Sequence, residues 1–522
     1  MRSVNTISLG AIGVVWLTIV CAVPCSAENK WIGYRSSITP QPDIMSACKA
    51  AVDVEYAPGA WPWSQDLLFK DTLRFTKLDY LYINPIMATC EFTARSPYNP
   101  EIYGTAGVIV ARYGTQCDTG NEYNPDTGRC DSTAGEIPRK QLGVPPFQGC
   151  ESNTFLGNPI NFSTGNKFQV EKDYLKTSSS PLEITRYYNS KDGIWRHTYS
   201  QSIFLTPEMV WITLEDGRQI KFSRMGSVIT SEQTELGTLK NTADGGWEYI
   251  SPNNERLRFT DWGVLVGKVD ALGRSVRIER TGTVIKVTDE FGGVLTLKEY
   301  GVAQLLSAEA PGVTINYTYN DLGELEVAEF KRHGSEIVEK RSYLYKPGTD
   351  KKLLIGLIDQ RGVQSSTWEY DEAGRATSSE HAGGVGHVNI AYNNDGTVNV
   401  TNELGKSTLY QFSLIQGVRR VVSIVGQPSP NCPYSNSTFT YDSRGLVETK
   451  SDAEGHLTTF AYNERGFEVK RVEGAGSAQQ RSISTEWDPV LPLKSKVFEP
   501  TRMTVFTYDG QGRPLSVQVT SN

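Results

Sequence analysis

The C-terminal half of the chain repeats one short signature, in which a tyrosine is followed by Asp or Asn and, three residues later, by glycine. The Asp or Asn side chain can accept hydrogen bonds from the backbone of a tight turn, and the glycine can take its positive-φ position. The signature therefore predicts β-hairpin turns. The six complete copies are Tyr319-Asn320…Gly323, Tyr370-Asp371…Gly374, Tyr392-Asn393…Gly396, Tyr441-Asp442…Gly445, Tyr462-Asn463…Gly466 and Tyr508-Asp509…Gly512. Five further turns lack the tyrosine: Asp270…Gly273, Asp289…Gly292, Asp359…Gly362, Asn402…Gly405 and Asp452…Gly455.

The spacing of these turns fits short strands. Where the register is cleanest, turns begin at Asp442, Asp452 and Asn463, about every ten residues, which leaves strands of roughly six residues. Upstream, Val210–Leu214 and Gln219–Phe222 flank an Asp-Gly turn and predict one more hairpin. We therefore predict a mainly β fold, a repetitive antiparallel hairpin sheet with almost no helix after residue 150.

These turn units resemble those of the Rhs/YD-repeat proteins, bacterial β-shell proteins that often carry toxins. A second match, in Gly157–Asn161, Thr164–Lys167 and Glu171–Asp173, with Leu182 and Thr185–Ser190 behind it, is similar to the module that precedes the repeats in that family. Together the two matches cover about residues 153–522. The resemblance implies an incomplete YD-repeat shell, preceded by its pre-repeat module and without a C-terminal toxin.

Larger relatives in this family release their toxin by self-cleavage at an Asp-Pro-x-Gly-Leu sequence. Here Asp488-Pro489-Val490-Leu491 lacks the glycine, and the repeats resume behind it at Tyr508. We therefore expect a strand–turn element at this position, and neither self-cleavage nor a toxic cargo in this chain. The last repeat strand should leave an open edge, which favours association with another chain.

The first residues have the pattern of a secretory signal peptide. Arg2 precedes an apolar run from about Leu9 to Val23, and Cys25 and Ala27 occupy the positions expected before a cleavage site. Pro24 ends the run below the ~20 residues that span a bilayer, which argues against a membrane anchor. We predict cleavage after residue 27, no remaining transmembrane segment, and a periplasmic, secreted or cell-surface location in a bacterium.

Six cysteines would remain after cleavage. An even number in an oxidising compartment favours disulfides. Cys117 and Cys130 bracket a polar turn and are predicted to pair, and Cys48 is predicted to bridge to Cys90. The pairing of Cys150 and Cys432 stays open, as one long-range bridge or two thiols. A metal site is the weaker interpretation, because the chain has no Cys-x-x-Cys motif and its five histidines are scattered.

The pattern along the chain divides it into five segments. Asp43 is expected to begin a helix in which Ile44, Cys48, Ala51 and Val52 share one face, followed by strand-like stretches. The predicted segments are a signal peptide (1–27), a small disulfide-bonded α+β domain (28–115), a disulfide loop and linker (116–150), a pre-repeat β module (151–260) and the YD-repeat sheet (261–522). The strand-like stretches of the small domain lie near Leu73–Phe75, Tyr80–Ile83, Thr89–Thr93 and Ala106–Tyr113.

Charge and motif content give no sign of catalysis or of nucleic-acid binding. The net charge of −7 over 522 residues is mild and there is no long basic run. No histidine stands in a recognised motif with Ser or Cys, and the Gly383–Gly386 stretch lacks the Lys-Ser/Thr of a phosphate loop, so we expect a wide hairpin turn there. We expect no enzyme, no cofactor and no metal.

The repeat tyrosines allow two interpretations. They could form an aromatic stripe that binds carbohydrate, or each ring could pack on the strand pair beside its turn, which we favour because every ring stands at a strand end. The predicted function is thus an exported, non-catalytic interaction protein that associates with a repeat-bearing or toxin-bearing partner chain. A carbohydrate-binding or cell-envelope surface module is the alternative, and an enzyme is a third.

Overall fold

The computed structural model describes residues 30–33, 47–51, 74–83, 86–95, 103–113, 121–124, 129–132, 138–143, 154–175, 180–205, 209–301, 303–349, 351–426 and 436–521. The predicted signal peptide lies outside these residues. No helix in this part of the chain is both long and apolar enough to span a bilayer.

One antiparallel sheet of 26 strands dominates the molecule, and its strands lie in the order of the sequence. It starts at Thr238, inside the segment that the sequence assigns to the pre-repeat module, and runs to Ser521. The predicted mainly β, hairpin-repeat fold class is confirmed. Its strands are β16 (Thr238–Asn241), β17 (Trp247–Ile250), β18 (Arg256–Phe259), β19 (Leu265–Val269), β20 (Ser275–Thr281), β21 (Val284–Asp289), β22 (Val294–Tyr300), β23 (Gln304–Ala310), β24 (Val313–Tyr319), β25 (Leu325–Arg332), β26 (Val338–Tyr345), β27 (Leu354–Ile358), β28 (Gln364–Tyr370), β29 (Ala376–His381), β30 (Val388–Tyr392), β31 (Val398–Thr401), β32 (Ser407–Ile415), β33 (Val418–Gly426), β34 (Ser437–Tyr441), β35 (Val447–Ser451), β36 (Leu457–Tyr462), β37 (Glu468–Glu473), β38 (Arg481–Trp487), β39 (Lys494–Glu499), β40 (Arg502–Tyr508) and β41 (Pro514–Ser521).

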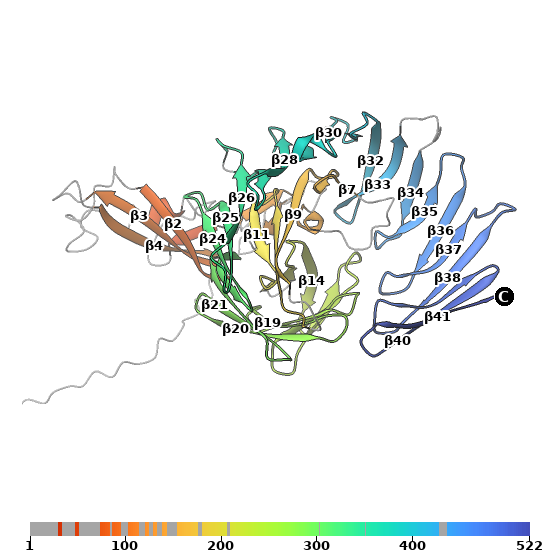
Figure 1. The fold of residues 1–522 in the computed structure, drawn as a ribbon, viewed down its shortest axis with the longest axis horizontal. Helices are drawn as coiled ribbons and strands as arrows, with labels where there is room; N and C mark the ends of the chain where they lie inside the picture. Colours follow the sequence, from red (N-terminus) through yellow and green to blue (C-terminus); the bar gives the residue numbers. More distant parts are fainter. Residues whose placement is uncertain are drawn as a thin grey trace, which may run out of the picture.

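Two smaller sheets lie inside the curve of this long sheet (Figure 1). The first, which we call the hub, contains β7 (Phe155–Leu156), β8 (Ile160–Asn161), β9 (Asn166–Leu175), β10 (Glu183–Asn189) and β11 (Ile194–His197). The second contains β12 (Ser202–Leu205), β13 (Met209–Thr213), β14 (Gln219–Met225) and β15 (Val228–Ser231), and its β13–β14 pair is the hairpin predicted around Asp216-Gly217. The apolar core joins all three sheets.

The turns of the long sheet have a common geometry, which the turn at Asp442 illustrates. Oδ1 of Asp442 accepts hydrogen bonds from the amides of Arg444 and Leu446, at 2.9 and 3.0 Å. The amide of Gly445 donates to the Asp442 carbonyl, and Gly445 has a φ of 77°. Every glycine of the six complete and five partial motifs has a positive φ, between 69° and 84°. A local side-chain bond and a left-handed glycine thus reverse the chain at each of these turns.

The repeat tyrosines tie neighbouring hairpins together. At five of the six complete repeats the hydroxyl donates to a backbone carbonyl of the strand before it, over 2.5 to 2.9 Å. The pairs are Tyr370 with Leu354, Tyr392 with Ala376, Tyr441 with Val421, Tyr462 with Val447 and Tyr508 with Lys494. The sixth, Tyr319, packs against the core. These rings therefore belong to the sheet itself.

The N-terminal part contains a separate four-stranded sheet of β1 (Lys30–Gly33), β2 (Arg74–Ile83), β3 (Ile86–Arg95) and β4 (Tyr103–Tyr113), in the order β1-β4-β3-β2. The first two strand-like stretches predicted from the sequence form one strand, β2. Residues 47–51 are helical, and Cys48 and Ala51 are buried there, whereas Ile44 and Val52 lie outside the described residues. The remaining described elements of this part are a β5–β6 hairpin (Asn121–Asn124 and Arg129–Ser132) and the short 3-10 helix η2 (Pro138–Gln141).

Candidate functional site: the hub and a carboxylate-lined cavity

A buried arginine fastens the hub to the inner face of the long sheet. Arg186 of β10 is ion-paired with Asp173 of β9, and the side chains of both are almost fully buried. Its guanidinium carbon lies 4.9 Å from the ring centres of Trp195 and Tyr317 and 5.2 Å from that of Tyr343. Arg186 Nη2 also donates to the Tyr343 hydroxyl at 2.6 Å. An arginine enclosed by its partner and three rings stabilises packing and is not available to a ligand.

A second cluster joins the start of the hub to β28 and β29. The Trp368 indole donates to the carbonyl of Asn158 at 2.9 Å, and the buried ammonium of Lys167 lies 4.2 Å from the Trp368 ring centre. Burial lowers the pKa of Lys167 well below its ordinary value. The amide of Ala376 donates to the carbonyl of Gly165, where an added β-carbon would come within 2.9 Å of the Arg375 backbone. Gly165 thus permits the close approach of hub and sheet.

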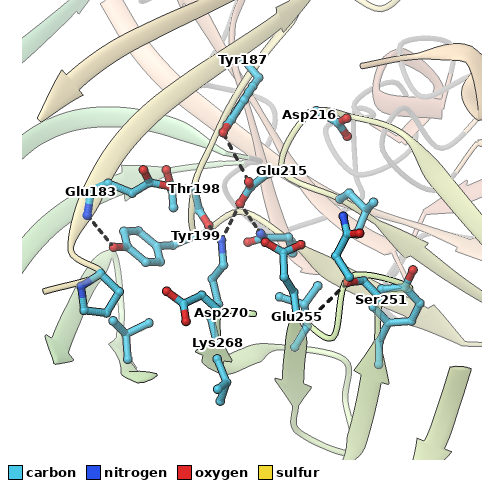
Figure 2. Close-up of a pocket in the computed structure, with 18 of the residues that line it drawn as sticks. Glu183, Tyr187, Thr198, Tyr199, Glu215, Asp216, Ser251, Glu255, Lys268 and Asp270 are labelled. Carbon is cyan, nitrogen blue, oxygen red and sulfur yellow. Dashed lines mark hydrogen bonds and ion pairs between the residues drawn. The ribbon is translucent and has the colours of Figure 1, made fainter. Parts of the chain in front are cut away.

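A cavity of about 950 Å³ lies between the hub, the second inner sheet and the first strands of the long sheet. Its size is in the range of ligand-binding pockets. Five carboxylate residues, Glu183, Glu215, Asp216, Glu255 and Asp270, line it together with three basic residues and three tyrosines (Figure 2). The basic residues are Arg218, Lys268 and Arg274, and the tyrosines are Tyr187, Tyr199 and Tyr249.

Glu215 is the centre of the hydrogen-bond network in this cavity (Figure 2). Its Oε2 accepts from Lys268 Nζ and from Gln201 Nε2, each at 2.5 Å, and its Oε1 accepts from the Tyr187 hydroxyl at 3.3 Å. Lys268 also donates to the carbonyl of Thr198 at 3.0 Å. The only lysine of the lining is therefore fixed in place by hydrogen bonds.

Two other carboxyl groups of the cavity have raised pKa values. Burial, and then the nearby charge of Glu215, raise the pKa of Glu183. The same two causes, in the same order, raise the pKa of Glu255. Removing water penalises the charged form of a carboxyl group, and a neighbouring carboxylate adds to that cost. A cationic neighbour would stabilise the charged form of both carboxyl groups.

Most residues singled out from the sequence lie elsewhere, although Asp216 of the predicted hairpin turn and Asp270 of a partial repeat turn line the cavity. The repeat-turn residues lie at the ends of strands along the long sheet, and the cavity is lined by none of their tyrosines or glycines. Among the disulfide candidates, Cys90 and Cys130 stand in β3 and β6, Cys48 is buried in the helical stretch, and Cys117 lies outside the described residues. The pairings stay predictions.

No sequence motif links the three glutamates of the cavity. Glu183, Glu215 and Glu255 come from three segments that belong to three different sheets or their connections, and their separation in sequence is irregular. Within the described parts of the chain, no group of three His, Cys, Asp or Glu side chains is placed to hold a metal ion.

A family model described as a domain of unknown function (DUF6531) matches residues 157–222. This range contains the Gly-Asn-Pro module, most of the hub and the β13–β14 hairpin. The double-stranded DNA deaminase toxin A of Burkholderia cenocepacia (strain H111) is 24% identical over 275 residues, which cover 44% of this chain and 19% of the toxin.

Two solved structures are similar only at low scores. The Photorhabdus luminescens Tc holotoxin pore matches with a TM-score of 0.31 and 9% identity, over 86% of this chain and 26% of that one. The TcdB2-TccC3-TEV crystal structure matches with a TM-score of 0.29 and 11% identity, over 72% of this chain and 22% of that one. The chain spans about a fifth to a quarter of the length of the relatives named here.

The fold agrees with the turns and the module that the sequence predicts. The repeat turns build one continuous sheet, and the family model matches the module that precedes it. Both are consistent with the resemblance to Rhs/YD-repeat proteins that the sequence motifs indicate.

Proposed function

We propose that the chain is an exported, non-catalytic wall segment of a toxin-related YD-repeat shell, and that another repeat-bearing chain pairs with its free edge. The observation that carries the proposal is the course of the long sheet, which curves around the hub and returns to its own beginning. Export is supported by the secretory pattern of residues 1–27.

The return of the sheet rests on contacts between distant turns. Arg465, in the turn between β36 and β37, donates to the carbonyl of Pro252, in the turn between β17 and β18, at 2.9 Å. Gln416 Nε2 donates to Gln233 Oε1 at 2.9 Å. A β-carbon added at Gly512 would lie 2.8 Å from the side chain of Leu272, so these two turns touch as well. A sheet whose distant turns contact one another in this way is suited to enclosing an interior.

The long sheet has two edge strands, β16 and β41, and the proposal concerns β41. Among the described strands it pairs with β40 alone, so one side of its backbone has no strand beside it. Leu515, Val517 and Val519 alternate along it and are 67%, 58% and 61% exposed. An exposed apolar edge strand pairs readily with another chain, and charged residues prevent such pairing. We infer that a strand from the partner covers this edge.

Light scattering coupled to size exclusion tests the free edge on the purified chain. We expect mass to rise with concentration for the wild type, and a Val517→Lys/Val519→Lys variant to shift toward the monomer. Val284→Lys/Val338→Lys is the matched control, because these valines are also exposed but belong to interior strands. A wild type that stays monomeric at all concentrations, or a control that dissociates as fully as the edge variant, would contradict the proposal.

The predicted disulfides belong to the same proposal. Non-reducing peptide mapping of periplasmic material should recover Cys117 joined to Cys130 and Cys48 joined to Cys90. Free thiols at these four positions would contradict the two predicted disulfides. The test leaves the edge argument untouched, because it concerns a different part of the chain.

A further inference from the structure

The edge strand β41 has a sequence that is nearly the same when it is read in either direction. Residues 516–520 read Ser-Val-Gln-Val-Thr, so two valines and two hydroxyl residues flank Gln518 symmetrically. Residues directly opposite each other in an antiparallel pair share one face of the sheet and pack together. Two copies of β41 centred on Gln518 would therefore place Val517 of one copy against Val519 of the other, and Ser516 against Thr520.

β41 also lacks the charges that keep edge strands apart. Lys450 and Arg471 stand five residues after the turn glycines of two interior repeats, and Val517 occupies that position in β41. None of the eight residues of β41 is charged. Charged side chains discourage the pairing of an edge with another chain, so their absence leaves β41 open to it.

The other edge of the long sheet is a poorer partner for β41. β16 has four residues against eight in β41, and its Lys240 is ion-paired with Glu248 at 2.9 Å. Leu236, directly before β16, would clash with a β-carbon added at Gly466, so the β36–β37 turn already lies beside this edge. Head-to-tail pairing of β41 with β16 of a second molecule would leave half of β41 uncovered.

The valines of β41 belong to the side of the sheet that forms the core elsewhere. Phe506 stands two residues before its repeat tyrosine, as the core residue Trp368 does in its own repeat. Val517 is opposite Phe506 in the ladder and faces the same side, and so does Val519. These valines are nevertheless 58% and 61% exposed. Covering them in a strand pair would remove apolar surface from water.

We propose that the strand that covers β41 comes from a second copy of this chain, in an antiparallel pair with a two-fold axis at Gln518. The inference rests on the proposed function, because it names the partner of the free edge. A two-fold axis at this position is perpendicular to the sheet, so the core-facing side of one wall continues into that of the other. The pairing occupies both β41 edges, and it therefore stops at two copies.

Disulfide cross-linking of the full chain tests the register. Opposite residues of an antiparallel pair have Cα atoms about 4.5–5.5 Å apart, a distance that a disulfide can span. Under mild oxidation, Gln518→Cys should give about tenfold or more linked dimer than Val284→Cys, an exposed position of the interior strand β21. Mass spectrometry of the linked peptides separates this bridge from those of the native cysteines.

A mixture of two single variants checks the same register. Val517→Cys mixed with Val519→Cys should give mainly the mixed pair, because two like residues would lie diagonally, about 7–8 Å apart. A wild type that stays monomeric contradicts the proposed edge pairing itself. A wild type that associates while Gln518→Cys links no better than Val284→Cys, or while like residues link better than the mixed pair, overturns only the second-copy inference.

Hydrogen–deuterium exchange of the wild type at rising concentration needs no substitution. Exchange should slow in peptides covering 514–521 and stay unchanged in those covering 238–241, and the mass should level off at the dimer. Slower exchange in both edge strands, or mass beyond the dimer, would show head-to-tail pairing and overturn the two-fold pair. Unchanged exchange in β41 at all concentrations would overturn it as well.

Discussion

At the residue scale, glycines in similar turns have very different surroundings. Gly263 and Gly273 have φ values of 82° and 84°, but an added β-carbon meets nothing within 4 Å at Gly273 and the carbonyl oxygen of Ile203, at 2.1 Å, at Gly263. Gly263 also accepts a hydrogen bond from the amide of Ile203, where the second inner sheet touches the long sheet. Its backbone has no room to move.

Alanine at these two positions should therefore differ in effect. Gly273→Ala should lower the free energy of unfolding by about 1–2 kcal/mol, the cost of a left-handed alanine. Gly263→Ala should cost clearly more, because a backbone atom must also shift. Urea denaturation of the two variants measures the difference, and equal losses would mean that the Ile203 contact is not tight.

Glu183 makes stability depend on pH. Burial and the charge of Glu215 raise its pKa, so the folded state holds this proton more tightly than the unfolded chain does. Its contribution must then fall as pH rises from the ordinary pKa of a glutamate through the raised value in the folded protein. Glu183→Gln keeps the neutral form at all pH values.

We expect Glu183→Gln to raise the melting temperature relative to wild type at pH 7.5, and to have a smaller effect at pH 4.5. Differential scanning calorimetry at the two pH values measures both. Glu326→Gln, an exposed control, should show no such dependence. A larger gain at the lower pH would reverse the sign of the argument.

At this scale the sequence predicts contacts between residues that are close together in the chain. The Asp442 side chain bonds amides two and four residues away, so one short motif contains the whole turn. The bond from Arg186 to Tyr343 joins residues 157 positions apart, and no spacing rule in the sequence predicts it. The cavity was missed for the same reason, because only the folded sheets bring its five carboxylates together.

At the scale of elements, the hub and the long sheet depend on each other. β10 presents Arg186 to rings from β24 and β26, and Asp173 of β9 accepts from the hydroxyl of Tyr317 at 2.8 Å. The sequence predicted each set of strands, but not that one lies inside the other.

Arg186→Ala should strongly weaken this contact. It leaves Asp173 buried without its main partner, and breaking a buried ion pair costs about 3–5 kcal/mol. Arg277→Ala, which removes an exposed pair with Glu279, should cost about 0–1 kcal/mol. Urea denaturation compares them, and a loss at Arg186 no greater than the loss at Arg277 would mean that the hub is not fixed by this residue.

At the scale of the whole molecule, Arg465 holds two distant turns together. Besides Pro252, its guanidinium donates to the carbonyls of Asp488, Pro489 and Val490, each at 3.1 Å. The Asp-Pro sequence thus lies in a turn between β38 and β39 that these hydrogen bonds hold in place. This confirms the strand–turn element that the sequence predicts there.

Arg465→Ala should weaken the contacts of its turn with the turns at Pro252 and at Asp488–Val490, and it should leave the hub intact. We expect faster hydrogen exchange in peptides around 250–254 and 488–492, and unchanged exchange in β9 and β10. Arg361→Ala is the control, since Arg361 is exposed and, among the described residues, its side chain bonds only Asp359 of its own turn. Faster exchange throughout the molecule would show that Arg465 supports global stability instead.

The order of the strands has a consequence for how the protein acquires its structure. Each of the 26 strands pairs with its neighbours in sequence, so no pairing has to wait for a distant part of the chain. The hub precedes all of them. A chain that emerges from its N-terminal end can complete the hub first and then add strands one at a time to a growing edge, as nearest-neighbour repeat proteins do. Synthesis in that direction would build the wall from its support outward, and an interrupted chain would stop with a shorter wall.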